Sequence, residues 1–208
     1  MMVEFLASAG PLVYPLALCS LLASTITIER MISLRRSRVL PSAIVEVVRA
    51  VEPGQDLGVA IAVCRRNPGV FADIIRVGLE QSSRPWEVMR DALLDAGRQK
   101  TVLLERHLVW LHTIAQAAPL LGLLGTVLGM IKMFASISLS GLGDPNALSD
   151  GISEAMATTA IGLAIGIPTL VAHNLLAAKS ESLITEIEAH ASHLVAHLRP
   201  ADVVESRS

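Results

Sequence analysis

Three long apolar runs, separated by polar segments, dominate the pattern along the chain. Residues 10–28 contain no charged side chain, and a helix of this length crosses a hydrocarbon core of ~30 Å at ~1.5 Å per residue. Comparable runs cover residues 108–138 and 151–178. The pattern therefore predicts an all-α membrane protein with transmembrane helices at residues 10–29, 108–138 and 151–178.

A polar segment at residues 30–107 holds 13 of the 17 Lys and Arg residues. Helical periodicity recurs at residues 43–51, 57–66 and 70–81, with Pro-Gly turn signals between them. An amphipathic pattern then starts near Trp86 and meets no helix breaker before the second apolar run. We predict a helical domain whose last helix continues into the membrane.

The distribution of basic residues predicts the orientation. Residues 1–9 and 139–150 carry none, so the positive-inside rule places residues 30–107 and 179–208 in the cytoplasm. Glu4 precedes the first apolar run and arginines follow it, which is the reverse of a signal peptide. Apolar positions from Leu183 to Leu198 form a helical stripe, so the third helix extends into the cytoplasm and its pattern ends at Pro200.

Composition excludes several classes of protein. With 52% hydrophobic and 17% charged residues, the chain is too apolar for an ordinary soluble domain. A net charge of −2 and the lack of a basic stripe do not fit nucleic-acid binding. Cys19 and Cys64 show no pairing pattern. The sequence offers no catalytic constellation, and we expect neither an enzyme nor a cofactor.

Residues 118–131 depart from a plain lipid anchor in several ways. The run contains a proline, small residues that permit close helix contact, a hydroxyl near its middle, and a lysine directly after it. These are Pro119, Gly122, Gly125, Gly129, Thr126 and Lys132. We expect Lys132 to reach the headgroups, with an ion pair to a neighbouring helix as the alternative. The pattern indicates a helix packed against others and facing something polar.

The third apolar run carries matching features. Glu154 lies at its start, Thr158 and Thr159 fall at a depth similar to that of Thr126, and Gly162 and Gly166 permit close packing. Glu154 can instead complement a helix N-terminus in water, and a membrane threonine commonly bonds its own i−4 carbonyl. Polar groups on two helices at one depth favour a hydrated pathway or a surface for a polar partner helix.

Three histidines lie along one flank of the C-terminal helix. His190, His193 and His197 align with Glu186 at a spacing that zinc sites use. The same flank borders the apolar stripe and faces the cytoplasm. We therefore expect a solvated edge and no metal site.

Residues 118–131 and 152–168 resemble the signature helices of the ExbB/TolQ/MotA proton-channel family. The Glu105-Arg106-His107-Leu108 entry into the second helix and Glu29-Arg30 after the first are also similar. The resemblance covers nearly the whole chain. Three spans make it closer to ExbB and TolQ than to the four-span MotA group.

The resemblance implies a homopentameric ring in the bacterial inner membrane around an ExbD/TolR-like single-span dimer, with residues 1–9 and 139–150 in the periplasm. Proton flow would drive work on a TonB/TolA-like protein, and the titrating aspartate would belong to the enclosed partner. Thr126, Thr159 and Glu154 match residues of the family, which implies a pore-lining role. Thr158 stands where some members have alanine, which leaves sodium open, and Lys132 departs from the family pattern.

Two other functions are open to the same residues. A non-conducting oligomeric scaffold could use the threonine-bearing faces to grip a partner helix. A secondary transporter is disfavoured because three spans contain no inverted repeat.

Overall fold

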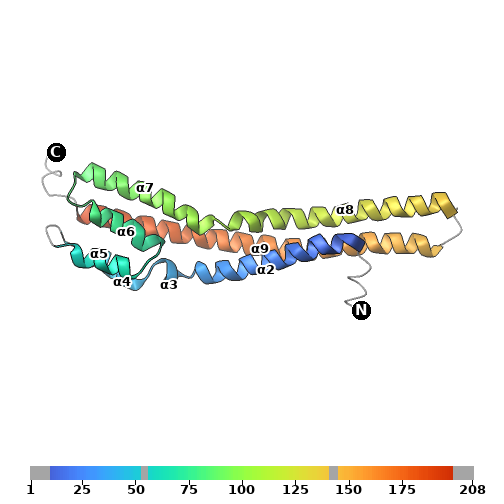
Figure 1. Ribbon diagram of the computed structural model, residues 1–208, viewed down its shortest axis with the longest axis horizontal. Helices are drawn as coiled ribbons and strands as arrows, with labels where there is room; N and C mark the ends of the chain where they lie inside the picture. Colours follow the sequence, from blue (N-terminus) through green and yellow to red (C-terminus); the bar gives the residue numbers. More distant parts are fainter. Residues whose placement is uncertain (1–9, 53–55, 141–144, 199–208) are drawn as a thin grey trace. The chain divides into compact units, whose positions relative to one another are not determined.

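The computed structural model describes residues 10–52, 56–140 and 145–198. The described residues are helical (Figure 1), with η1 at Gly10–Leu12, α2 at Val13–Ser33, α3 at Arg36–Val39, α4 at Ser42–Ala50, α5 at Gly58–Arg66, α6 at Val70–Glu80, α7 at Trp86–Glu105, α8 at Leu108–Ser140 and α9 at Pro145–His197. They form two compact units. Unit 1 comprises Met1–Glu29 and His107–Leu175, and unit 2 comprises Arg30–Arg106 and Leu176–Ser208.

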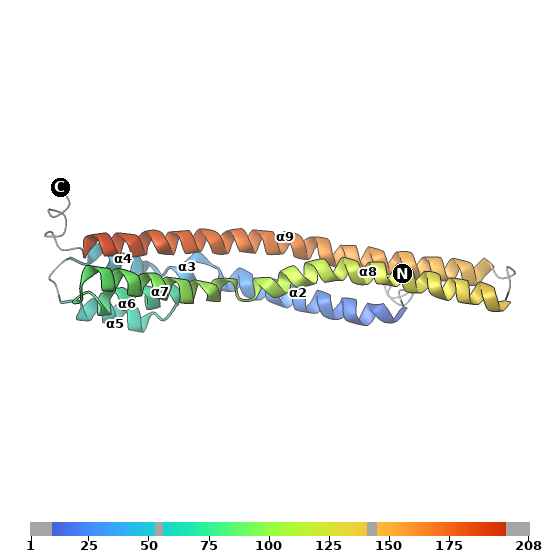
Figure 2. The same ribbon diagram turned by 90° about the horizontal axis from the view of Figure 1, so that it is seen from above.

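Unit 1 contains most of α2, all of α8 and the first part of α9. In the two side views α8 and α9 run antiparallel and next to each other (Figures 1 and 2). Among the side chains of unit 1, Leu111 and Ala118 of α8 and Leu16 of α2 are fully buried. Large apolar side chains such as Leu120 and Ile167 point outward, as expected of helices that meet lipid.

Among the described residues, three helical stretches are long and apolar enough to cross a membrane: Val13–Ser33, Trp86–Ala135 and Gly151–His197. The all-α class and the three candidate spans predicted from the sequence are therefore confirmed. The second stretch includes α7 and α8 as far as Ala135.

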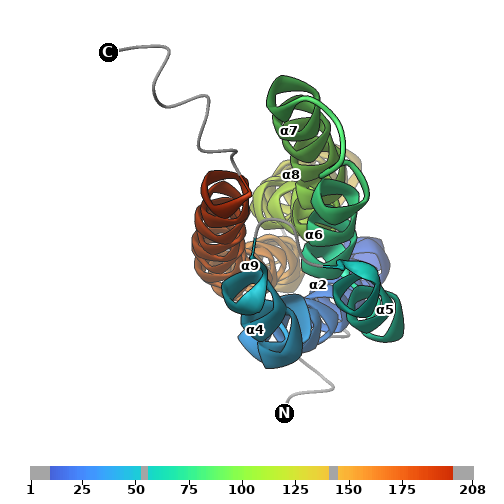
Figure 3. The same ribbon diagram turned by 90° about the vertical axis from the view of Figure 1, so that its left-hand side faces the viewer.

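Unit 2 is a bundle of α3 to α7 with the C-terminal part of α9 (Figure 3). Its core includes Phe71 from α6, Ile44 from α4, and Leu183 and Ile187 from α9. A Cβ on Gly78 would lie 2.6 Å from Leu93 Cδ1 and 3.3 Å from Leu194 Cδ2, so α6 meets α7 and α9 closely there. The helices predicted at residues 43–51, 57–66 and 70–81 are confirmed as α4, α5 and α6.

The predicted continuous helix from Trp86 into the second span is interrupted. α7 ends at Glu105 and α8 begins at Leu108. The buried Arg30 guanidinium donates to the Leu103 and Leu104 carbonyl oxygens, at 3.5 Å and 3.4 Å. A cation at the carboxyl end of a helix is favourable and occupies carbonyls that a continuing helix would use, so tertiary contact ends α7.

The helices also reach further into the predicted loop at residues 139–150. α8 continues to Ser140, and α9 starts at Pro145, where the fixed φ of proline suits a first helical position. Residues 141–144 lie outside the described residues. So do residues 1–9 and 199–208, which include the predicted N-terminal segment and the predicted end of the last helix at Pro200.

Candidate functional site between α8 and α9

The glycines assigned to packing all lie where α8 and α9 touch. A Cβ on Gly162 would lie 2.6 Å from the Ala118 carbonyl oxygen, and one on Gly166 would lie 2.6 Å from Pro119 Cγ. On α8, a Cβ on Gly122 would lie 3.0 Å from Thr159 Cα. The remaining contacts of this kind are Gly125 with Thr158 and Gly129 with Ala155. A side chain at these positions would prevent the two helix backbones from approaching so closely. We call the region of α8 and α9 around these five glycines the glycine contact.

Thr158 lies inside the glycine contact. Its side chain is fully buried, packs on Gly125, and its hydroxyl donates to the Glu154 carbonyl oxygen at 2.7 Å. Burial against α8 makes Thr158 part of the helix packing, a contact that sequence spacing does not reveal. The pore-lining role expected of this residue stays a prediction.

Thr159 and Thr126 occupy different positions in the same region. The Thr159 hydroxyl donates across the helices to the Gly122 carbonyl oxygen at 2.9 Å, and its side chain is half-buried. The Thr126 hydroxyl donates to the Leu123 carbonyl oxygen at 2.7 Å, and this side chain is half-buried as well. The hydrogen bond of Thr126 therefore stays within α8 and is open to the surroundings, whereas that of Thr159 joins the two helices and is partly buried.

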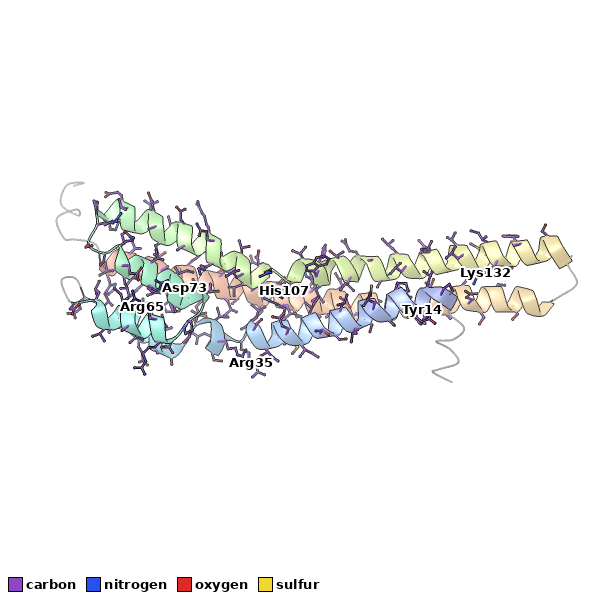
Figure 4. All side chains as sticks on the ribbon, viewed as in Figure 1. Tyr14, Arg35, Arg65, Asp73, His107 and Lys132 are labelled. Carbon is purple, nitrogen blue, oxygen red and sulfur yellow. The ribbon has the colours of Figure 1, made fainter. Side chains whose placement is uncertain are left out.

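Lys132 of α8 and Glu154 of α9 form an ion pair, with Nζ and Oε1 2.6 Å apart. The ion pair to a neighbouring helix, which was the alternative for Lys132, is present, and the expectation that Lys132 reaches the headgroups stays a prediction. Glu154 does not cap a helix N-terminus either, because α9 begins at Pro145. Pairing lowers the cost of both charges near lipid. Figure 4 labels Lys132 towards one end of α8 and His107 beside the other.

A small cavity adjoins this ion pair. Its volume is about 120 Å³, and Lys132, Glu154, Thr158 and Pro11 are among its lining residues. Most of its wall is apolar, with leucine and isoleucine side chains beside the ion pair. One end of the α8–α9 pair therefore combines an ion pair with a small, mainly apolar cavity.

Histidines that the sequence reasoning did not single out gather at the opposite end of unit 1. The rings of His112 on α8 and His173 on α9 lie 4.8 Å apart, centroid to centroid. His173 Nδ1 is 3.1 Å from the Leu108 carbonyl oxygen, and His112 Nε2 is 3.2 Å from Gln116 Nε2. His107 Nδ1 lies 2.9 Å from Glu29 Oε2. Histidines in otherwise apolar runs were the sequence signal for this cluster.

The flank of α9 that has the spacing of a zinc site lies in unit 2. Its side chains do not point towards a common centre. Glu186 is bound to Arg36, His190 packs against Phe71 with centroids 5.6 Å apart, and His193 stacks on His197 at 4.1 Å. Within the described part of the chain, no group of three or more His, Cys, Asp or Glu side chains is placed to hold a metal ion.

The contacts on this flank shift the pKa of Glu186 and the pKa of His190. The Arg36 guanidinium, which bonds to the Glu186 carboxylate, lowers the pKa of Glu186. Burial lowers the pKa of His190, and the nearby Glu186 opposes that shift. The flank therefore stabilises unit 2, and nothing in its geometry favours a ligand.

Comparison with known proteins adds to this geometry. Residues 67–189 match the family model described as the MotA/TolQ/ExbB proton channel family. The biopolymer transport protein ExbB-like 3 of Synechocystis sp. is 36% identical over 179 residues, which cover 81% of this chain and 81% of that protein.

Two further relatives are similar. The biopolymer transport protein exbB1 of Vibrio cholerae is 30% identical over 197 residues, covering 86% of this chain and 80% of that protein. The Tol-Pal system protein TolQ of Pseudomonas aeruginosa is 32% identical over 120 residues, covering 58% and 48%. With the family match and three apolar helices long enough to span a bilayer, these similarities establish a membrane protein, and the chain belongs to the MotA/TolQ/ExbB proton channel family.

Proposed function

We propose that the chain is the ring-forming subunit of an ion-driven motor in the bacterial inner membrane. Five copies would surround a dimer of ExbD/TolR-like single-span proteins, with the N-terminus in the periplasm and residues 30–107 in the cytoplasm. Ion flow would be converted into work on a TonB/TolA-like protein. The proposal rests on family membership and on the basic residues gathered between the first two spans.

The observation that carries the ion-path assignment is the polar line along α8 and α9. The Lys132–Glu154 pair lies at one end, and the Thr126 and Thr159 hydroxyls follow toward the middle. A hydroxyl can donate and accept without holding an ion tightly. These threonines would solvate the ion as it reaches and leave an aspartate on the enclosed partner, with Glu154 at the outer mouth. Thr158 would act as a packing residue.

The proposed ion is a proton, with sodium as the alternative. The family description names proton channels. Hydroxyl oxygens also suit sodium, so the threonines do not decide between the two.

A non-conducting scaffold that anchors a periplasmic machine is the second candidate. One observation favours it: the Thr159 hydroxyl is engaged with the Gly122 backbone, as a purely structural residue would be. A scaffold would depend on the shape of Thr159 and not on its hydroxyl.

The test is a pair of isosteric variants, Thr126→Val and Thr159→Val, in the complex purified from its host through a tag on this chain. Both should assemble into rings of the normal copy number. Ion flux in proteoliposomes and partner-dependent work in cells should fall by about tenfold or more, since each removes a hydroxyl from the path.

Thr113→Val is the matched control, because the Thr113 side chain is exposed and its hydroxyl donates to the Val109 carbonyl oxygen of the same helix at 2.9 Å. It should retain full flux. Full flux and full partner function in both pathway variants would contradict the ion path and favour the scaffold function. A monomer or dimer in native mass measurements would contradict the ring.

A further inference from the structure

The ionisable side chains of unit 1 divide into two groups at opposite ends of the α8–α9 pair. Lys132 and Glu154 lie at one end. At the other are four groups, of which three are imidazoles: Glu29, His107, His112 and His173. Among the described side chains of unit 1, only Tyr14 and Cys19 are other ionisable groups. The histidine end therefore needs its own explanation, which the threonines do not supply.

His112 and His173 continue the line of the threonines. His112 precedes Thr126 by 14 residues in α8, and His173 follows Thr159 by 14 residues in α9. Fourteen residues are just under four helical turns, so each histidine shares a face with its threonine, about 21 Å further along the helix. Because the helices are antiparallel (Figure 2), both histidines lie at the same end, where their rings meet.

The hydrogen bonds prepare the two rings for proton exchange. A backbone carbonyl can only accept, so His173 Nδ1, 3.1 Å from Leu108 O, carries the proton and leaves Nε2 as the basic atom. On His112, Nε2 faces the amide nitrogen of Gln116 at 3.2 Å. His112 is exposed and His173 is half-buried. One ring thus reaches the surroundings of the helix pair, and the other lies within it.

From this arrangement we infer that His112 and His173 form the inner end of the ion path, that they pass protons between the threonine region and the cytoplasm, and that the transported ion is therefore H⁺. This inference rests on the proposed function. One imidazole takes up a proton and becomes charged, then returns to neutral as the other ring or water accepts that proton. Charge and proton number are conserved at each transfer.

Imidazole suits this position for a chemical reason. It accepts and releases protons near neutral pH and can do both at separate nitrogens. A sodium path needs oxygen ligands, which an imidazole pair does not offer. A carboxylate lies at the same end of unit 1: Oε2 of Glu29 in α2 is 2.9 Å from Nδ1 of His107, just before α8. That carboxylate provides a next acceptor towards the cytoplasm.

The test measures proton flow in proteoliposomes that contain the complex purified from its host through a tag on this chain. A potassium–valinomycin potential drives the flow, and a trapped pH dye reports it, with sodium-free and sodium-containing buffers compared. His112→Gln and His173→Gln should each slow proton flow by about tenfold or more, with ring assembly unchanged. External imidazole should restore part of the flow in both variants.

His193→Gln is the matched control, since this histidine stacks on His197 in unit 2 and should conduct normally. Wild-type complex that carries no ion would overturn the proposed function together with this inference. Wild-type complex that carries sodium and not protons would overturn the inference and leave an ion-driven motor with sodium as its ion. Wild-type complex that carries protons, with both histidine variants equally fast, would overturn only the inference.

A second measurement uses wild-type complex and therefore does not depend on the assembly of the histidine variants. Two imidazoles on facing helices can share one zinc ion, so micromolar zinc applied to wild-type complex should slow proton flow, and the His193→Gln control should be equally sensitive. Proton flow that zinc leaves unchanged would contradict a path through the pair.

Discussion

Thr158 and Thr159 follow one another in α9, yet their surroundings differ. Thr158 is buried against Gly125, whereas Thr159 is half-buried and donates to the Gly122 carbonyl oxygen of α8. Adjacent helical residues point about 100° apart, so one faces the neighbouring helix and the other its edge. At the scale of single residues, roles in this protein depend on which side of the glycine contact a side chain occupies.

Lys132 and Glu154 allow a direct test at the same scale. We expect Glu154→Gln and Lys132→Met each to lower the melting temperature of the complex in detergent, because each leaves one charge unpaired near lipid. The double variant should recover most of the loss. The side chains are 54% and 22% exposed, so the coupling free energy should be about 1 kcal/mol or less. Strictly additive effects in the double-mutant cycle would contradict the pair.

At the scale of elements, the fold of unit 1 depends on how closely α8 and α9 approach. Gly162 meets the Ala118 carbonyl oxygen and Gly166 meets Pro119, so backbone lies against backbone along several turns. Without a hydrophobic drive inside a bilayer, such close packing is a main source of helix association. The glycines therefore set the distance at which the polar groups of both helices meet.

Gly162→Ala should test this packing. Its added methyl would lie 2.6 Å from the Ala118 carbonyl oxygen, which requires a backbone shift that costs about 1–3 kcal/mol. Gly97→Ala in α7 is the matched control, because nothing lies within 4 Å of its Cβ position. That change should stabilise the chain by about 0.5–1 kcal/mol. Equal thermal shifts for the two variants in detergent would show that the contact is loose.

At the scale of the whole molecule, the two units differ in the chemistry that stabilises them. Unit 1 combines small-residue packing with few polar groups, as a bilayer requires. Unit 2 has a core of large apolar side chains around Phe71 and Ile187 and surface ion pairs such as Lys100–Asp73 at 2.6 Å. A change of pH should therefore alter the stability of unit 2 first, whereas substitutions at the glycine contact should alter the stability of unit 1.

The pH dependence of unit 2 gives a prediction with a definite sign. Burial lowers the pKa of His190, so below the ordinary value of ~6.5 the unfolded chain binds a proton more readily than the folded one, and stability falls as pH falls through that window. The charged groups around this ring are Glu186, Arg49, Arg36 and His193. His190→Gln should flatten the pH dependence of the unfolding temperature between pH 7.5 and pH 5.5, as followed by circular dichroism.

The Arg36–Glu186 pair should contribute at lower pH. Its carboxylate has a lowered pKa, so its contribution is present above the ordinary glutamate range and is lost as pH falls through the folded value. Glu186→Gln, compared with His190→Gln, separates the two windows. If both variants leave the pH profile of the unfolding temperature unchanged, the pH dependence does not arise from His190 and Glu186.

The order of residues is enough to predict the helical class, the three apolar spans, α4 to α6 to within one residue at each end, and the family. Each of these depends on local composition or periodicity, which the order of residues records directly. It also singled out the glycines and threonines as exceptional, because small and hydroxyl residues are conspicuous in an apolar run.

The partners of these residues, by contrast, follow from the packing of one helix against another. Thr158 is buried by Gly125, Lys132 meets Glu154, Arg30 ends α7, and His112 meets His173. Each of these contacts joins different helices, and many residues separate the partners in the sequence. Such pairs depend on the register and separation of two helices, and periodicity within one helix carries no information about either.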